Sequence, residues 1–193
     1  MNDIALSWDL FIVVFFVVVI SYSFIVGLSR NLKILISSYV SILVADGFSE
    51  ILRKYFFSQD PLIPIFKVEN NENTFIIFKI SIFVIFMVLF VIRGNFSINL
   101  RTKPTGFLGW ASNASFGFLN AGIITATILR YVSGASFVDG TGEPANSALF
   151  SIYSQSKLVK LMIDNYNFWF SLPALVFITI SLFMSSRDSG SEE

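Results

Sequence analysis

Two oppositely charged side chains, Asp46 and Lys79, interrupt long apolar stretches of the sequence. If those stretches cross a membrane, a charge at the membrane centre costs at least ~2.5 kcal/mol, and an opposite charge on a neighbouring helix offsets part of that cost. At a helical rise of about 1.5 Å per residue, Asp46 lies roughly 9 Å before the end of its stretch at Leu52, and Lys79 lies roughly 6 Å past Phe75. Two interpretations stay open: an ion pair, or Lys79 reaching outward while Asp46 bonds to a serine or faces water.

The sequence contains neither histidine nor cysteine, which removes imidazole bases, thiolate nucleophiles and nearly all zinc, haem and iron-sulfur ligation. Ser112, Ser115 and Ser154 are not assigned as nucleophiles, because no histidine exists and no lysine stands at a recognisable partner spacing. No Walker motif or dinucleotide fingerprint occurs either. We therefore expect no enzyme activity, no catalytic residue, no metal and no cofactor. The sequence alone does not support a proton-relay role for Asp46.

A candidate helix-packing face lies within residues 106–131, where small or short polar residues recur every four positions: Gly109, Asn113, Gly117 and Ala121. Small residues at this spacing let two helix backbones approach closely. We expect this face to pack against residues 32–52 of the same chain, with contact between copies of the chain as the alternative. Asn113 and Asn120 could hydrogen-bond between helices there, each contributing on the order of 0.6 kcal/mol. Glu50 is one more intramembrane polar candidate.

The composition indicates that these residues belong to a membrane protein. Of the 193 residues, 54% are hydrophobic and 13% are charged, about half the charged share of a typical soluble domain. Several apolar runs approach the roughly 20 residues that cross a bilayer. Because of these apolar runs, the lipid bilayer is the expected partner. Thirteen basic and thirteen acidic residues leave no net charge, so nucleic acid is not an expected partner.

We predict an all-α protein, a polytopic transmembrane helical bundle of about five spans that forms a single domain over residues 1–184. The predicted spans cover residues 10–28, 32–52, 75–92, 106–131 and 168–184. Apolar residues at helical spacing predict an amphipathic helix on the membrane over residues 147–166, and the polar residues 185–193 predict a disordered tail.

Two of the predicted spans differ in the surroundings that their side chains require. The serines and acids of the span 32–52 indicate that other helices surround most of it. The phenylalanines of the third span are distributed around the helix instead of forming one groove, so we expect them to face lipid: Phe75, Phe78, Phe83, Phe86 and Phe90.

The short loops predict the orientation, because cytoplasmic loops carry an excess of Lys and Arg. The first and third loops hold basic residues and no acidic ones: Arg30, Lys33, Arg93, Arg101 and Lys103. The N-terminal segment and the other two loops hold acids that offset their basic residues. We therefore expect the first and third loops and the C-terminus in the cytoplasm, and the N-terminus outside.

Three stretches together carry a family resemblance. Trp8-Asp9 opens the first span, and Gly27-Leu28-Ser29-Arg30 closes it before a weakly polar span. The four-residue ladder from Gly109 to Ala121 follows later, and then Ser154-Gln155-Ser156-Lys157-Leu158. In order and character these stretches resemble the colicin V production, or CvpA-type, family of bacterial inner-membrane proteins.

The chain also departs from that family's pattern. Thr102-Lys103-Pro104-Thr105 stands where an acidic-basic pair usually introduces the glycine ladder, and Asn31 stands where an acidic residue often follows the arginine. The fifth predicted span goes beyond the family's common four-helix core. The chain therefore resembles a divergent member, over roughly Trp8 to Met162.

The resemblance implies an accessory or structural subunit of the bacterial inner membrane, linked to colicin V toxin production or export and to envelope maintenance, without any catalytic residue. Other membrane proteins or copies of the chain are then the expected partners. The alternative is a small channel or transporter that uses the polar second span and Asp46. Transporters generally contain paired repeats or broken helices around a central site, and because the sequence has no convincing internal repeat, the accessory role is favoured at this level.

Overall fold

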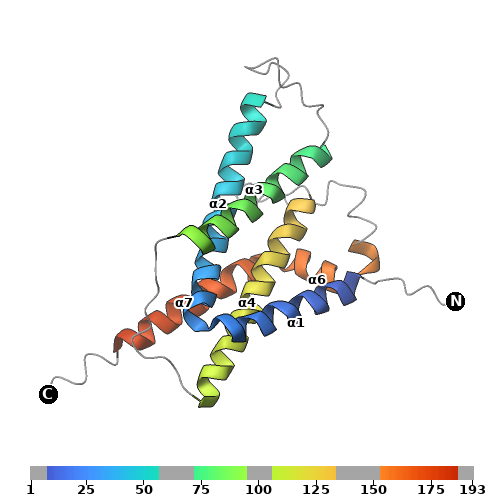
Figure 1. Ribbon diagram of the computed structural model, residues 1–193. Coiled ribbons are helices and arrows are strands. Elements are labelled where there is room, and N and C mark those ends of the chain that lie inside the picture. The colour runs from blue at the N-terminus through green and yellow to red at the C-terminus, as the bar shows by residue number, and fades with distance from the viewer. Residues whose placement is uncertain (1–7, 57–71, 95–105, 134–152, 187–193) are drawn as a thin grey trace.

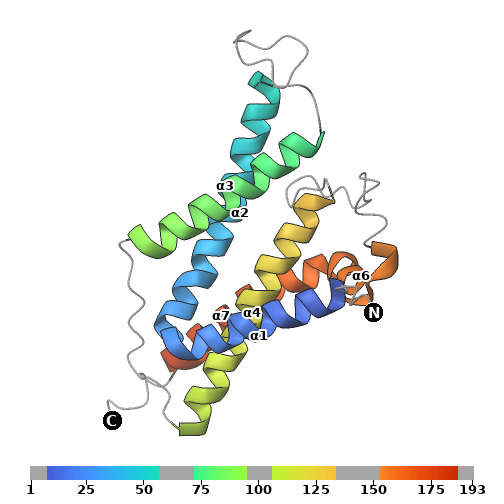
Figure 2. The ribbon, with the colours of Figure 1, turned by 45° about the vertical axis from the view of Figure 1, so that its right-hand side comes forward.

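A computed structural model describes residues 8–56, 72–94, 106–133 and 153–186, and these residues form helices without any strand among them. This confirms the predicted all-α class. Figure 1 shows the helices in chain order: α1 Trp8–Val26, α2 Leu28–Phe56, α3 Glu72–Arg93, α4 Gly106–Val132, α6 Lys157–Asp164 and α7 Tyr166–Ser186. In both Figure 1 and Figure 2, α1 crosses α4, and α2 lies against α3.

The connection between α1 and α2 is shorter than predicted. Gly27 alone separates the two helices, and its φ of 78° lies in the left-handed region that glycine adopts without strain. Arg30 and Lys33 consequently belong to the first turns of α2 and not to a loop. The predicted start of the second span at residue 32 is therefore wrong, because one glycine is enough to separate the two helices.

Four helices, α1 to α4, contain segments long and apolar enough to cross a membrane. The pair Lys157–Asp164 and Tyr166–Thr179 meets the same criteria together but is bent by 66°, so the protein has up to five spans if the bent pair counts as one. Four or five spans agree with the predicted number of about five, and the fifth depends on counting the pair bent at Asn165 as one span. The chain is a multi-pass membrane protein by the length and composition of its helices.

The amphipathic helix was predicted over residues 147–166, and the structure places a shorter helix, α6, at Lys157–Asp164. Residues 147–152 of this prediction lie outside the described part of the chain. Of the predicted tail 185–193, the first two residues belong to α7 and residues 187–193 also lie outside the described part. On α6, Val159 and Met162 are buried while Lys157 and Lys160 are exposed. The helix is therefore amphipathic, and its buried side packs on α1 and α4.

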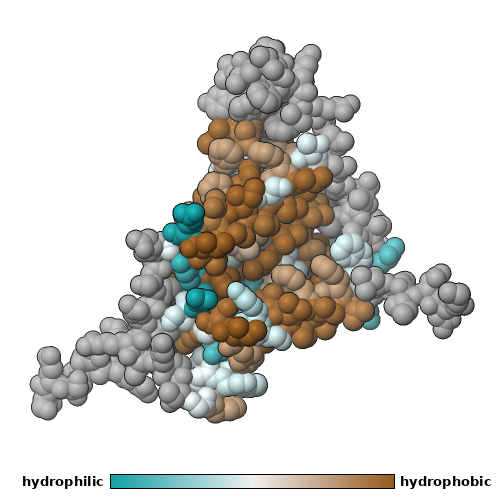
Figure 3. Space-filling model, viewed as in Figure 1, coloured by the Kyte–Doolittle hydropathy of each residue, from teal (hydrophilic) through white to brown (hydrophobic). Residues whose placement is uncertain are grey.

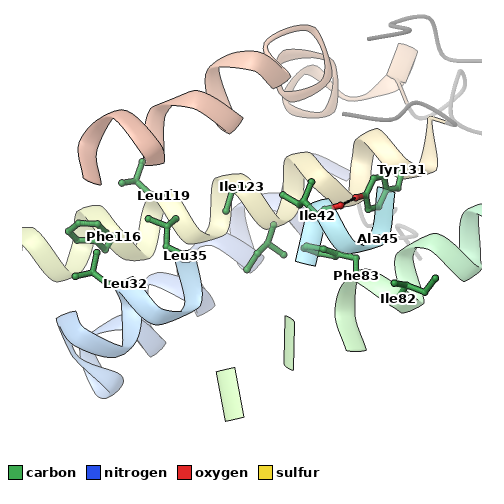
Figure 4. Close-up of a cluster of buried hydrophobic side chains, with 11 residues drawn as sticks. Leu32, Leu35, Ile42, Ala45, Ile82, Phe83, Phe116, Leu119, Ile123 and Tyr131 are labelled. Carbon is green, nitrogen blue, oxygen red and sulfur yellow. Dashed lines mark hydrogen bonds between the residues drawn. The ribbon is translucent and has the colours of Figure 1, made fainter. Parts of the chain in front are cut away.

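A buried apolar cluster lies where α2, α3 and α4 meet (Figure 4). Leu35 and Ile42 of α2 lie beside Ile123 of α4, and Phe83 of α3 lies near Tyr131. Because lipid is as apolar as these side chains, close packing and not exclusion from water holds such helices together. The polar side of α2 is covered as expected, with small residues in every fourth position and no exposed surface: Ser37, Ser41, Ala45 and Ser49.

The face of the bundle seen in Figure 3 is predominantly apolar where its residues are described, as the brown areas show. Along α3, Ile85 and Ile92 are exposed, as expected for side chains that face lipid. The lipid-facing prediction for the phenylalanines is wrong for Phe83, which is buried in the core, and holds for Phe78. A helix in contact with a neighbour buries one side, and sequence alone did not identify that side.

Candidate functional site: a charged centre inside the bundle

The structure brings Asp46 and Lys79 together. Lys79 Nζ lies 2.8 Å from Asp46 Oδ1, and the two side chains are 7% and 1% exposed, respectively. Asp46 comes from α2 and Lys79 from α3, the two helices that pack most extensively on each other. Of the two sequence interpretations, the ion pair is therefore the one that the structure supports. Removing either partner would leave a buried charge uncompensated, which costs about 3–5 kcal/mol in comparable proteins.

Three more residues complete what we call the charged centre. Lys79 Nζ lies 4.6 Å from the centroid of the Tyr131 ring, and Tyr131 OH donates a hydrogen bond to Ile42 O at 3.4 Å. Arg130, which is 4% exposed, places its guanidinium carbon 3.5 Å from the centroid of the Tyr166 ring. The charged centre thus consists of Asp46, Lys79, Arg130, Tyr131 and Tyr166, from α2, α3, α4 and α7.

The sequence interpretation missed Arg130, Tyr131 and Tyr166. A signal was present, because Arg130 lies inside the apolar run 106–131 and an intramembrane arginine normally faces the protein interior. The predicted candidate Glu50 lies one turn after Asp46 on α2 and is exposed, so it does not share the burial of the charged centre.

A second polar cluster lies at the other end of the bundle, where α1 and α2 meet α4. Ser23 Oγ donates to Asn113 O at 2.5 Å, and Asn31 Nδ2 donates to Ser23 Oγ at 2.6 Å. Asn120 Nδ2 donates to Asn31 O at 3.1 Å. We call these four residues the asparagine joint; they contain hydroxyl and amide groups and no charge. Asn113 and Asn120 therefore do bond between helices, as the sequence indicated.

The small-residue face of α4 packs on α1 at its central glycine, and not on the second span as predicted. A Cβ atom at Gly117 would lie 2.7 Å from Ser23 Cβ and 3.0 Å from Ile20 Cα, both on α1. Ala121 is fully buried, whereas Gly109 and Asn113 are partly exposed. Because α1 already occupies this contact, the chain uses the glycine for packing within itself. The pairing of α1 with α4 could not be read from residue spacing.

A second glycine of α4 was not singled out by the sequence. A Cβ atom at Gly122 would lie 2.6 Å from Cζ3 of Trp169, so the indole of α7 occupies the space above this glycine. Trp169 is buried and also contacts the ring of Phe16 on α1, at 6.0 Å between centroids. The first turns of α7 are thereby fixed against α4 and α1.

The backbone hydrogen bonding of helix α7 is altered just after this contact. Pro173 lies inside the helix and lacks the backbone donor of an ordinary residue. One position later, Ala174 N donates to the hydroxyl of Tyr39 at 3.1 Å, and that hydroxyl donates to Phe170 O. Tyr39 of α2 is therefore inserted into the hydrogen-bond ladder of α7 between Phe170 and Ala174, an arrangement that bends helices.

The start of α6 is held by the start of α1. Ser156 caps α6 by accepting from Val159 N at 3.0 Å, and its hydroxyl donates to Asp9 Oδ1 at 2.5 Å. The same carboxylate oxygen accepts from Leu158 N at 2.9 Å. An acid at a helix N-terminus is favourable because it satisfies free backbone donors. Asp9 thus joins two stretches that lie 147 residues apart in the sequence.

The chemistry available at the charged centre is the binding and release of a proton, or electrostatic contact with a small ion. Within the described helices, no group of three or more Asp, Glu, His or Cys side chains could hold a metal ion. In comparisons with known proteins, the chain matches no protein-family model, no curated protein and no solved structure.

Proposed function

We propose that this chain is a small channel or transporter that moves protons or small ions through the charged centre. The observation that carries the proposal is the burial of Asp46, Lys79 and Arg130 inside a helix bundle with an apolar outer surface. Ionisable residues are rare within membrane spans, and where they occur they commonly mark ion paths and proton relays.

The broken fifth span supports the same function. Transporter sites commonly lie beside discontinuous helices, whose ends bring free backbone groups to the site. Here the break between α6 and α7 is at Asn165, and Tyr166, the first residue of α7, contacts Arg130 of the charged centre. The accessory role was favoured because the sequence has no convincing internal repeat; the bend of 66° supplies the other common feature of transporters, a broken helix.

A proton or cation acting on Asp46 would change the contact between α2 and α3. When the carboxylate takes up a proton, it no longer compensates Lys79, and the ion pair that joins the two helices is lost. Repacking of α3 beside Tyr131 and Arg130 would then reach α7 through Tyr166. The charged centre thus couples the state of one acid to the position of a broken helix.

The test is flux into liposomes that contain only the purified protein, measured with an internal pH indicator under an imposed membrane potential. The parent protein should acidify the vesicles faster than empty vesicles do. The double variant Asp46→Asn with Lys79→Met should return the rate to that of empty vesicles, because it removes both charges together and leaves neither of the two unpaired.

The matched control is Lys160→Met with Asp164→Asn, which removes one base and one acid from the exposed side of α6. This variant should keep the parental rate. A parent protein no faster than empty vesicles would refute proton transport by this chain. A parental rate in the charged-centre variant would show that protons do not pass by Asp46 and Lys79.

The second candidate is an accessory subunit of a secretion or envelope complex in the bacterial inner membrane, as the colicin V production resemblance implies. A specific observation favours it: Asp9 of the first resembling stretch bonds to Ser156 and Leu158 of the last one. Crosslinking in native membranes, followed by gentle detergent extraction, should then recover the chain with other membrane proteins. Recovery only as an isolated monomer would count against this role.

The proposed orientation in that membrane has the N-terminus outside and the C-terminus in the cytoplasm. The basic residues Arg30, Lys33 and Arg93 lie at the ends of spans without a nearby acid, and this bias keeps its meaning when they belong to the terminal turns of α2 and α3. Because the chain has no native cysteine, single cysteines test it directly. Asn70→Cys should react with an impermeant reagent in intact cells, and Thr102→Cys only after permeabilisation. The reverse pattern would invert the orientation.

A further inference from the structure

Three basic residues gather where α2 begins and α3 ends. Lys33 Nζ of α2 donates to Gly94 O, directly after the last residue of α3, at 2.7 Å. Arg93 is the neighbour of Gly94, and Arg30 precedes Lys33 by about one turn; both arginines are exposed. Figure 3 shows hydrophilic side chains at the edge of the apolar surface where α3 ends in Figure 1.

The sequence around this basic edge contains no acid. No Asp or Glu occurs between Asp9 and Asp46, or between Glu72 and Asp139. The start of α2 also directs unused backbone N–H groups and the positive end of its helix dipole toward the same edge. A negative group from outside these stretches would therefore be attracted to the edge.

An aromatic cluster places the edge at the level of lipid headgroups. At the same end of the bundle, the ring of Trp110 on α4 lies 5.5 Å from Phe24 of α1 and 6.3 Å from Phe107. All three rings are exposed on an apolar surface, as in the aromatic belts at membrane interfaces. Asn31, the neighbour of Arg30, is joined to this end of α4 through Ser23.

The surface next to the basic edge is suited to acyl chains. Along α3, Ile85, Val88, Leu89 and Ile92 are exposed, and Ile92 is 70% exposed although it directly precedes Arg93. A lipid on this surface would place its tails along α3 and its headgroup beside Arg93. Arginine can form two parallel hydrogen bonds to a phosphate group, which gives it geometric as well as electrostatic preference for such a group.

We infer that the edge formed by Arg30, Lys33 and Arg93 binds the phosphate headgroup of an anionic phospholipid whose tails lie on α3. Charge complementarity and the adjoining apolar strip together select a lipid over a soluble anion, because only a lipid occupies both surfaces. Each basic residue near an anionic membrane surface contributes about a fivefold increase in affinity. This site is separate from the charged centre and does not depend on the proposed transport.

The experiment uses the full chain in nanodiscs that contain phosphatidylglycerol and phosphatidylcholine in equal amounts, and native mass spectrometry counts the lipids retained on the released protein. The parent should retain phosphatidylglycerol selectively. Arg30→Gln with Arg93→Gln should lower its affinity by about fivefold per arginine removed. The control Lys157→Gln with Lys160→Gln, which removes two exposed cations from α6, should retain as much as the parent.

A second measurement needs no variant: the Tm of the parent should be higher in phosphatidylglycerol than in phosphatidylcholine nanodiscs, and added inorganic phosphate should not reproduce the rise. An unchanged Tm, or a rise produced equally by inorganic phosphate, would overturn the lipid site. Equal retention by the parent and the arginine variant would also overturn it.

Discussion

The charged centre and the asparagine joint are both buried polar clusters between helices, but they contain different kinds of polarity. The centre contains full charges, Asp46 against Lys79, with Arg130 nearby. The joint contains only hydroxyl and amide groups, packed around the bare backbone of Gly117. A charge in an apolar interior needs an opposite charge beside it, whereas neutral polar groups need only a hydrogen-bond partner on a closely packed helix. The centre should therefore be sensitive to charge, and the joint to volume.

Each cluster also lies beside a break in the chain. At the joint, Gly27 separates α1 from α2 by a single residue, and Asn31 bonds back across this break to Ser23. At the centre, Asn165 separates α6 from α7, and Tyr166 contacts Arg130 just after it. The joint thus fixes a tight turn with short neutral hydrogen bonds, while the centre places ionised groups at the end of a bent helix. This difference favours the centre as the functional site.

The largest effect is expected from unbalancing the centre. Asp46→Lys or Lys79→Asp alone would place two like charges in a buried site, and each should cost about 3–5 kcal/mol because one charge loses its partner. The double exchange restores opposite charges on α2 and α3 and should recover most of the loss. The measurement is the amount of folded protein extracted from membranes and its survival of a heat challenge.

The control for this exchange is Lys160→Asp on the exposed side of α6, which should be close to neutral. If the losses of the two single variants add in the double variant, the side chains of Asp46 and Lys79 do not depend on each other. The charged centre would then not be sensitive to charge in the way that this comparison with the asparagine joint requires.

The sequence predicted the elements well because the membrane demands about 20 apolar residues for each span. It also predicted that Asp46 and Lys79 lie at similar levels of their two helices, and the contact between the two side chains agrees with this. It could not predict which helices are neighbours, so Gly117 was assigned to the wrong partner. The predicted boundary between the amphipathic helix (147–166) and the fifth span (168–184) lies within two residues of the break at Asn165, although neither Gly nor Pro stands there to mark it.

A smaller effect is expected from filling the joint. Gly117→Leu would insert a side chain where even a Cβ atom would lie 2.7 Å from Ser23 Cβ, so α1 and α4 must separate. Overpacking of this kind costs about 1–3 kcal/mol. The control Ile85→Leu conserves volume on an exposed position of α3 and should be nearly silent. Equal heat stability of both variants and the parent would show that the contact of α1 with α4 is not tight.

The smallest effect is expected from Asn120→Leu, which removes a polar group from the joint without changing its volume greatly. Asn120 Nδ2 donates to Asn31 O, but its buried Oδ1 has no hydrogen-bond partner among the described residues. Hydrogen bonds between membrane helices contribute about 0.6 kcal/mol on average, and relieving an unsatisfied buried oxygen offsets part of that loss.

The expected change for Asn120→Leu is therefore about half a kcal/mol or less. Asp46→Leu is the matched substitution at the centre, and it should cost several-fold more because Lys79 is left buried without its counter-charge. The heat stability of the two leucine variants, measured side by side in the same detergent, compares a neutral with a charged cluster directly. A loss from Asn120→Leu as large as that from Asp46→Leu would mean that the joint depends on its polarity as strongly as the centre does. The distinction between the two regions would then have to be abandoned.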